Sequence, residues 1–491
     1  MKFITRKVSA AAFAVLFAGL LAAGVAFISP AGAAAPDTTY LVLAPKGAST
    51  DKAAEKVARA GGTVVANYSQ IGVLVARSTN SAFATEASGP GVEAVASTEG
   101  LGTPLADDET LETVDSAAVD ATGNPAGEPL FGLQWDMTQI DTPQANAVTT
   151  GSPDVVVGVL DSGISSTHPD LATQIAKDKS ASCLGGVVNT AEAAWNPTTS
   201  THGTHVAGTI AAAINGVGIA GVAPGVKVAS VKVVDDAGFI YPAAAVCGFV
   251  WAADHGMQIT NNSYFIDPWE FNCRNDARQR PIWQAVQRAI RYAQNKGVLT
   301  VASAGNENFD LQHKFIDPIS PDDGSSPAET REINGACLDL PAEAPGVVTV
   351  SAVGTQRLKS YYSSYGQGVV DVSAPGGDTR QPNPAVSTIA NAVLSTTINT
   401  TTRVNGWGYL QGTSMAAPHA SGVAALALSA HPGLQPGALA SFLERTAEEL
   451  PCPAGIYNPR PGLDRYLAQC TGGARNSFYG AGEVNAFNAV K

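Results

Sequence analysis

Three widely separated segments each carry one residue of the kind used in nucleophilic catalysis: Asp161, His202 and Ser414. A serine hydroxyl attacks poorly unless an imidazole takes its proton, and that imidazole needs a carboxylate to fix its tautomer and stabilise its cation. Asp161 follows the predicted strand VVVGVL, while His202 and Ser414 each lie at the start of a predicted helix. Strand ends and helix starts meet at one edge of a parallel sheet, so the three side chains can face a single cleft.

Each of these residues also fits a structural role, and the segments taken singly leave that alternative open. Thr413 or Ser414 can cap the helix that begins there, with a side-chain oxygen accepting a backbone N–H. Asp161 can serve as a turn or capping residue. His202 and His205 lie one helical turn apart, which suits a metal, but no HExxH motif or nearby carboxylate completes such a site. We therefore assign His205 to packing.

Nucleophilic attack on a carbonyl also needs donors for the negative charge that develops on its oxygen. Asn306, in the segment TVASAGNEN just past a predicted strand, can offer its side-chain amide. The backbone N–H of Ser414, at a helix start, can offer a second donor. Asn306 considered alone also fits an ordinary turn, so its interpretation as an oxyanion donor depends on the other three residues.

Composition excludes several classes of function. The chain has 491 residues, which predicts two or more domains and a large core. Charged residues make up 14% and hydrophobic residues 45%, a balance typical of a compact protein rather than a disordered one. The formal net charge of -13 argues against nucleic acid or an anionic membrane as the main partner.

The N-terminus has the pattern of an export signal. Lys2, Arg6 and Lys7 precede an apolar run over 8–28, and the small-residue segment AGAAA follows at 31–35. The run is long enough for a membrane anchor, but its alanine content and small-residue exit favour removal. We predict a cleaved signal peptide over 1–35 and a secreted, extracellular protein without a membrane association.

Six cysteines agree with an oxidising destination. None forms a C-x-x-C pair, so neither zinc ligation nor thioredoxin-type chemistry is indicated. We predict three disulfides among the 15 possible pairings, with Cys452–Cys470 the most local of them. Buried free thiols are the alternative.

The segment over 36–101 has a pattern of its own. It alternates predicted strands and helices in the order βαββαβ, at Tyr40–Leu43, Thr50–Ala60, Gly62–Tyr68, Ile71–Arg77, Ser81–Ala87 and Val92–Ser97. That order predicts a small ferredoxin-like α+β unit. The following segment, 102–129, contains acidic but no basic residues, so we interpret it as a solvated linker exposed to proteolysis.

From residue 130 to the C-terminus at 491, short β-branched runs alternate with helices rich in Ala and Gly. The predicted strands are Val155–Leu160, Val226–Val234, Gln258–Asn261, Val298–Ala302 and Val347–Val353. The predicted helices include His202–Asn215, Ala243–His255, Pro281–Asn295 and Ser414–Ala430. This alternation predicts an α/β fold with a parallel sheet covered by helices on both faces.

Four segments carry a resemblance to a known family. VVVGVLDSGISSTHPDL, HGTHVAGTIAAA, VASAGNEN and GTSMAAPHASG are similar to the signatures of subtilisin-like serine proteases, peptidase family S8, in the order Asp, His, Asn, Ser. The resemblance runs from about Gln134 to the C-terminal YGAGEVNAFNAV. It implies a seven-stranded parallel sheet, a triad of Asp161, His202 and Ser414, an oxyanion donor at Asn306, and endopeptidase activity on proteins and peptides.

The same resemblance implies how the chain is organised. The 36–101 unit looks like the propeptide of such enzymes, which acts as an intramolecular inhibitor and chaperone and is removed by autoprocessing. The linker would be lost with it, leaving 130–491 as the catalytic domain. The start of the mature chain, between about 101 and 132, is not fixed by the sequence. We expect the mature enzyme to be a monomer.

The resemblance also places the substrate. The segment TNNSYF matches the edge strand that pairs with an extended peptide, with substrate-binding residues at Ser263, Tyr264, Phe265, Ala304 and Gly305. Tyr264 and Phe265 replace the usual glycines, which either narrows the pocket or reflects simple packing of the two rings.

A long connection over 307–340 is a second departure from the family pattern. It carries acidic residues and lies beside the predicted cleft, so it is either a specificity loop, a calcium site or a solvated surface insertion. Its acidic residues are Asp317, Asp322, Asp323, Glu329 and Glu332. The preference for the residue before the cleaved bond stays undetermined.

No cofactor is expected for catalysis, but many members of the family hold a structural calcium ion. The matching positions here are the side chains of Asp170 and Asn215 and the carbonyls of Ala213, Val217 and Ile219, with Gln134 as a further ligand. Hard oxygen ligands of this kind suit Ca²⁺.

Overall fold

A computed structural model describes residues 37–98, 112–114, 127–320 and 330–491. The predicted signal peptide, most of the predicted linker, and Asp322, Asp323 and Glu329 lie outside the described residues. Within these ranges, none of the helices has the length and apolar character needed to cross a bilayer.

A small antiparallel sheet forms the first part of the described chain. Its strands lie in the order β2-β3-β1-β4, the ferredoxin-like arrangement predicted from the sequence. Val42, Leu74 and Phe83 fill a core between one face of the sheet and its two helices. The elements are β1 (Thr38–Leu43), α1 (Asp51–Arg59), β2 (Thr63–Tyr68), β3 (Val73–Ser78), α2 (Phe83–Glu86) and β4 (Ala94–Ser97).

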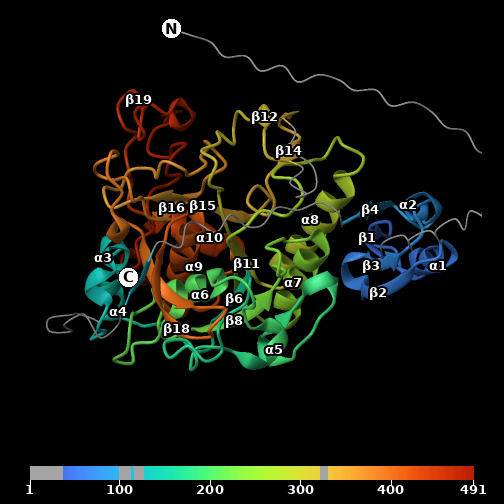
Figure 1. The fold of residues 1–491 in the computed structure, drawn as a ribbon, viewed down its shortest axis with the longest axis horizontal. Helices are drawn as coiled ribbons and strands as arrows, with labels where there is room; N and C mark the ends of the chain where they lie inside the picture. Colours follow the sequence, from blue (N-terminus) through green and yellow to red (C-terminus); the bar gives the residue numbers. More distant parts are fainter. Residues whose placement is uncertain (1–36, 99–111, 115–126, 321–329) are drawn as a thin grey trace, which may run out of the picture. The chain divides into compact units, whose positions relative to one another are not determined.

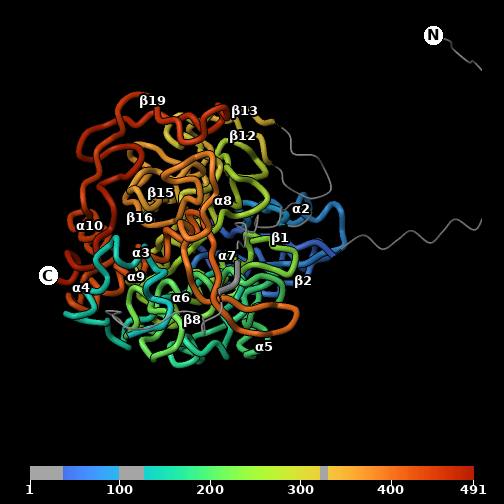
Figure 2. Tube along the Cα trace, turned by 60° about the vertical axis from the view of Figure 1, so that its left-hand side comes forward, coloured from blue at the N-terminus to red at the C-terminus, as the bar shows by residue number. Residues whose placement is uncertain are grey.

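The other face of this small sheet packs on the larger part of the chain. Leu41, Val73 and Val75 share a hydrophobic cluster with α7 (Pro242–Asp254) and α8 (Arg280–Asn295). Both views show the small unit, in blue, beside these two helices (Figures 1 and 2). Because α7 and α8 lie on the surface of the large sheet, the small unit adds a further layer to it.

A seven-stranded parallel sheet is the centre of the larger part. Its strands lie in the order β16-β15-β11-β9-β6-β8-β7, and every neighbouring pair is parallel. The strands are β6 (Val156–Asp161), β7 (Ala181–Ser182), β8 (Lys227–Lys232), β9 (Ile259–Asn262), β11 (Leu299–Ser303), β15 (Val347–Val353) and β16 (Val372–Pro375). The predicted fold class and the seven-stranded sheet are therefore confirmed.

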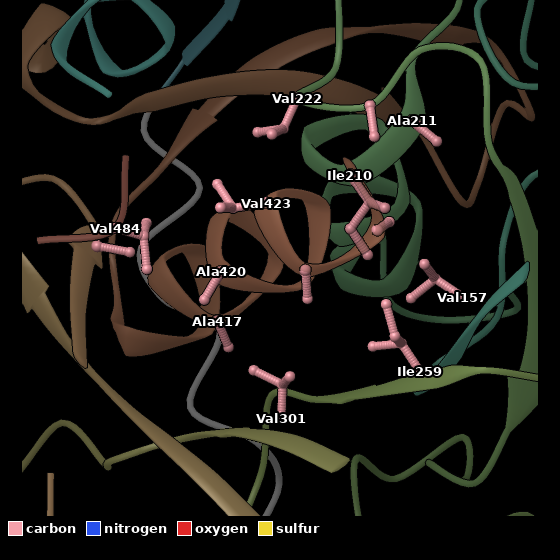
Figure 3. Close-up of a cluster of buried hydrophobic side chains, with 14 of the residues drawn as sticks. Val157, Ile210, Ala211, Val222, Ile259, Val301, Ala417, Ala420, Val423 and Val484 are labelled. Carbon is pink, nitrogen blue, oxygen red and sulfur yellow. The ribbon is translucent and has the colours of Figure 1, made fainter. Parts of the chain in front are cut away.

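Alternate residues of the strands face opposite layers, as the two-residue period of a strand requires. In β6, Val157 and Val159 face a core that includes α6 (His202–Ala211) and α9 (Thr413–Ala430). Val156 and Leu160 face the core with α7 and α8. Figure 3 shows the first of these cores, with Val157 and the neighbouring strand's Ile259 directed toward the two helices.

Helix α9 is buried along almost its whole length, from Thr413 to Ala427. Small residues allow it to lie between other layers, and nothing charged interrupts it. Pro418 sits in its first turns, and the N–H that proline lacks would have bonded to the carbonyl of Ser414. The Ser263 hydroxyl takes that place, donating to the Ser414 carbonyl at 2.9 Å.

A separate three-stranded antiparallel sheet leads into α9. It consists of β17 (Val393–Ile398), β18 (Asn405–Leu410) and β5 (Glu112–Val114) in the order β17-β18-β5. Strand β5 belongs to the segment interpreted from the sequence as a solvated linker. Glu128, at the end of that segment, is fully buried, and its Oε1 accepts the N–H groups of Asn215 (2.6 Å) and Gly216 (2.8 Å). Acidic composition alone did not reveal these backbone partners.

All six cysteines form disulfides, in the pairs Cys183–Cys247, Cys273–Cys337 and Cys452–Cys470. The predicted number and the predicted local pair are therefore confirmed. Cys273–Cys337 ties the strand β10 (Asn272–Cys273), which precedes α8, to β14 (Cys337–Leu338), near the end of the 307–340 connection.

Candidate active site

An acid and a base meet at the carboxyl edge of the parallel sheet. Asp161 is the last residue of β6 and His202 is the first residue of α6. Nδ1 of His202 lies 2.9 Å from Oδ1 and 3.0 Å from Oδ2 of Asp161. The side chains are only 6% and 1% exposed, respectively. A buried carboxylate is a strong acceptor, so this contact holds the proton on Nδ1 and leaves Nε2 as the basic nitrogen.

The approach of α6 to this pair depends on a glycine. A Cβ atom at Gly203 would lie 2.6 Å from the carbonyl oxygen of Gly163 and 2.9 Å from Oδ1 of Asp161. The N–H of Gly203 instead donates to the Ser162 hydroxyl at 3.0 Å. Any side chain at position 203 would therefore push His202 away from its carboxylate.

Ser414 is the second residue of α9 and lines one small cavity together with His202 and Asn306. The cavity has a volume of about 110 Å³. The N–H of Ser414 is among the first four of the helix, which have no partner within it. The structure thus brings the imidazole, the hydroxyl and a helix N-terminus to one concave site.

Asn306 has a fixed orientation at this site. Its Oδ1 accepts both the N–H and the hydroxyl of Thr413, each at 2.9 Å. The amide group is planar, so holding the oxygen toward Thr413 turns the NH₂ group away from it. Ser414 follows Thr413 directly, and the same contacts therefore place the amide beside the start of α9.

The predicted substrate-binding residues lie around the same cavity. Ser263, Tyr264, Phe265 and Gly305 line it, whereas Ala304 is fully buried behind it. The Tyr264 hydroxyl donates to Oδ1 of Asn262 at 3.0 Å, and its ring is buried. The sequence left open whether Tyr264 narrows the pocket or is simply packed. Its ring is buried and also forms part of the cavity wall.

Two acidic residues of the cavity wall were not singled out from the sequence. Glu307 and Asp339 both line it. Oε2 of Glu307 accepts the N–H of Asn306 at 2.7 Å, and burial raises the pKa of Glu307 to about 7. Glu307 is adjacent to a predicted site residue, but nothing in the spacing marks Asp339.

The acidic residues predicted for the long connection have other surroundings. Asp317 is fully buried and forms an ion pair with Arg331. Glu332 is exposed and does not line the cavity. The connection contributes Glu307 and Asp339 to the cleft, which are acids from its two ends.

His205 has the packing role expected of it. It is fully buried, with Nε2 at 3.2 Å from the carbonyl oxygens of both Val393 and Gly408. Burial, reinforced by the nearby His202, lowers the pKa of His205 to about 3. A neutral ring that donates to backbone carbonyls suits this position between α6 and β17–β18.

The residues predicted to hold calcium lie together, but their oxygen atoms face N–H donors. Oδ2 of Asp170 accepts Nε1–H of Trp407 (2.7 Å) and the N–H of Ile219 (3.2 Å). Asn215 points its NH₂ group at Oδ1 of Asp170 (3.5 Å), and its own Oδ1 accepts the N–H of Val217 (2.9 Å). A calcium cage needs converging oxygens, so the Asn215 side chain would have to turn over to place its Oδ1 beside the carboxylate of Asp170.

Gln134 and Ala213 also form hydrogen bonds with the backbone, but the Ala213 bond uses its N–H and not the carbonyl predicted to bind calcium. The N–H of Ala213 donates to the Asp170 carbonyl at 2.9 Å. Gln134 exchanges two hydrogen bonds with the backbone of Ala220, at 2.9 and 3.0 Å. Among the described residues, no cluster of three or more His, Cys, Asp or Glu could hold a metal ion.

Comparison with known proteins gives consistent matches. The model of the subtilase family matches residues 152–482. Fervidolysin from Fervidobacterium pennivorans is 30% identical over 341 residues, covering 67% of this chain but 42% of its own length. Subtilisin DY from Bacillus licheniformis is 31% identical over 296 residues, covering 60% of this chain and 84% of its own.

Solved structures agree with the sequence matches. A protease from Pseudoalteromonas arctica is 29% identical with a TM-score of 0.54, covering 74% of this chain and 98% of its own. The epidermin leader peptide processing protease of Staphylococcus aureus, at 22% identity, shares the fold with a TM-score of 0.65 and covers 93% of this chain and 98% of its own.

The surroundings of Asp170 generate a pH-dependent prediction. Burial raises the pKa of Asp170 to about 7, against the hydrogen bonds from Trp407 and Ile219 that favour the ionised form. The folded protein therefore holds a proton that the unfolded chain releases near pH 4. The free energy of unfolding should fall between about pH 4 and 7 through this group, by an amount on the order of 4 kcal/mol, and stay level above pH 7.

Denaturant titrations at several pH values give the free energy of unfolding of wild type and of Asp170→Asn. The decrease of this free energy with pH should be smaller in Asp170→Asn. The exposed Asp178→Asn is the matched control and should keep the wild-type slope. Excess calcium should leave the wild-type slope in place. If the free energy of unfolding of wild type no longer decreases with pH when calcium is present, but does so without it, the ion binds the ionised Asp170 carboxylate and the hydrogen-bonded loop rearranges.

Proposed function

The chain belongs to the subtilase family of serine endopeptidases, and from that premise we propose that Asp161, His202 and Ser414 hydrolyse peptide bonds in proteins. The observation that carries the proposal is the buried hydrogen bond between His202 and Asp161. His202 also lines one cavity together with Ser414 and Asn306. Carboxylate, imidazole and hydroxyl are the three groups that acyl transfer by serine requires.

The proposed reaction begins with proton transfer to Nε2 of His202 as Oγ of Ser414 attacks the peptide carbonyl. Asp161 stabilises the imidazolium that forms. The imidazolium then protonates the departing amine, which leaves an acyl-enzyme on Ser414. Water attacks the acyl carbon, gives its proton to His202, and releases the carboxylic acid while Ser414 regains its hydrogen.

Two donors are proposed to hold the oxyanion, the side-chain NH₂ of Asn306 and the N–H of Ser414. The Thr413 contacts to Oδ1 of Asn306 support this assignment, because they orient the amide before substrate arrives. Donors that are already oriented need no reorganisation when charge develops, which is why such groups contribute strongly to catalysis. The reaction uses no cofactor.

The segment over 37–98 is proposed to be an inhibitory propeptide of a secreted zymogen. Three contacts with the larger part support the proposal. Arg288 of α8 forms an ion pair with Glu93 (2.7 Å) and donates to the carbonyl of Ala44 (2.9 Å). The Tyr68 hydroxyl donates to the carbonyl of Gly186 at 2.7 Å. Together with the apolar cluster on α7 and α8, these contacts bury the docked face of the segment.

Replacing the nucleophile tests the proposed function most simply. Ser414→Ala should lower kcat on a casein or peptide substrate on the order of 10⁶-fold, the loss expected when the serine of such a triad is removed. A serine-reactive phosphonate should label the processed wild type and not the variant, as read by mass spectrometry. Ser429→Ala, near the other end of α9, is the control and should label normally. An unlabelled wild type would refute the proposal.

A second prediction distinguishes the role of the Asn306 oxygen, which accepts from Thr413, from that of its NH₂ group, the proposed oxyanion donor. Asn306→Asp keeps an oxygen for Thr413 but removes the proposed donor, so kcat should fall at least about 10²-fold with little change in KM. Thr413→Val removes one contact to Asn306 and keeps the donor, so its kcat should fall much less. Equal losses in the two variants would assign Asn306 to anchoring the helix rather than to the oxyanion.

Autoprocessing gives a third prediction. Ser414→Ala, produced in a host without other secreted proteases, should keep residues 37–98 covalently joined to the rest of the chain. Wild type produced in parallel should release them, as seen by N-terminal sequencing. Release from the variant at the wild-type position would rule out self-cleavage.

A further inference from the structure

The wall of the cavity beside Ser414 includes two acidic residues. Glu307 and Asp339 are its charged wall residues besides the histidine, and the described residues contribute no lysine or arginine to that wall. A third acid, Glu270, is nearby, because a Cβ at Gly305 would lie 2.9 Å from Oε2 of Glu307 and 3.6 Å from Oε1 of Glu270. Carboxylates that converge on one cavity repel each other unless a cation is present.

Asp339 lacks the partners that a buried carboxylate normally has. It is 2% exposed, and within the described part of the chain its Oδ1 has no hydrogen-bond partner. Burial, with Glu343 and Glu307 nearby, raises the pKa of Asp339 well above its usual range. Leaving such a group unpaired is costly. A buried acid that faces a cavity without a partner points to a ligand that supplies one.

The basic residues near the cavity already have acidic partners. Lys314 pairs with Glu343, and both side chains are nearly buried. Arg331 pairs with Asp317. Glu343 uses its other oxygen to accept the N–H of Asp339 at 2.8 Å. These pairs neutralise Glu343 and Asp317. Within the described ranges neither Glu307 nor Asp339 forms an ion pair, although Lys314 lies close enough to act on Asp339.

The geometry of attack decides which part of a substrate reaches these acids. Ser414 and the proposed oxyanion donors fix the carbonyl that is cleaved. The side chain of the same residue is attached to the neighbouring Cα, so it is the group that enters the adjoining cavity, whose wall includes Tyr264 and Phe265. Aromatic side chains in the wall suit the aliphatic stem of a long side chain, and carboxylates in the same wall suit a terminal cation.

We propose that Glu307 and Asp339 form an acidic specificity pocket, which selects substrates with lysine or arginine immediately before the cleaved bond. The inference rests on the proposed endopeptidase function and names its substrate class. Glu307 and Asp339 act in binding, since neither contributes to the acyl-transfer steps.

The test is a peptide series, identical except for Lys, Arg, Met, Leu or Glu before the cleaved bond, assayed with the processed full enzyme. We expect kcat/KM for Lys and Arg to exceed that for Met by about 10- to 100-fold, the range of a charge-assisted hydrogen bond in a buried site. Glu should be the poorest substrate. A wild type that cleaves Met or Leu peptides as well as Lys peptides overturns the proposal, with no variant needed.

Variants assign the preference to residues. Asp339→Asn and Glu307→Gln should each lower the Lys-to-Met ratio of kcat/KM, and the double variant should bring it near one. Glu332→Gln, an exposed acid in the same connection, is the matched control and should keep the wild-type ratio. Phosphonate labelling of each protein counts the working active sites. An unlabelled wild type refutes the endopeptidase function itself, whereas a labelled one without basic preference refutes only the pocket.

A divalent cation is the competing occupant of the two carboxylates. Added calcium should leave the Lys-to-Met ratio of the wild type unchanged. A ratio that falls with calcium in the wild type but not in the double variant would assign Glu307 and Asp339 to the metal and overturn the proposal.

Discussion

The arrangement of the site depends on one buried hydrogen bond, between Nδ1 of His202 and the carboxylate of Asp161. A carboxylate that is 1% exposed is costly to bury unless its oxygens are used. Here they accept from the imidazole and from the N–H of Ser162 at 2.6 Å. The bond can form only because β6 ends at Asp161, α6 begins at His202, and Gly203 offers no side chain between them. One contact therefore fixes the position of the His202 ring, the tautomer of that ring and the burial of the Asp161 carboxylate.

The hydrophobic core supplies the rigidity that this bond needs. Helices α6 and α9 both pack on the same face of the sheet, so the imidazole and the hydroxyl are attached to one continuous core. The Ser263 hydroxyl bonds to the Ser414 carbonyl where Pro418 leaves it without an N–H donor. The nucleophile is thereby tied to the strand that is proposed to pair with substrate. A shift of α9 would disturb both at once.

Much of the fold could be predicted from local patterns, and the failures have physical causes. The β-branched runs ending at Leu160 and Ala302 are buried on both faces, so their composition marks them clearly. Strands β17 and β18 form a local hairpin joined through 399–404, but they were not predicted, because glycines at 406 and 408 weaken the strand signal. Local order within 36–101 was sufficient to predict its strand and helix sequence.

A site residue could be predicted where the sequence immediately around it indicates its role, and not where its role depends on distant segments. The residues predicted as ligands around Asp170 lie together, but the Trp407 indole that donates to the Asp170 carboxylate comes from 237 residues away and was not predicted. Asp339 directly follows β14, which is held against β10 by strand pairing and by Cys273–Cys337, so its place in the cavity wall depends on segments 64 residues apart. No spacing rule connects Asp339 to Glu307, and their juxtaposition is therefore visible only in three dimensions.

Nitrogen NMR of the processed protein, labelled at its histidine rings, tests the central hydrogen bond most directly. The signals of His202 can be assigned by their loss in His202→Gln. In the pH range where the ring is neutral, the account predicts a proton on Nδ1 and an unprotonated Nε2, with the preference lost in Asp161→Asn. A proton found on Nε2 in the wild type would contradict the account, because no base would then face Ser414.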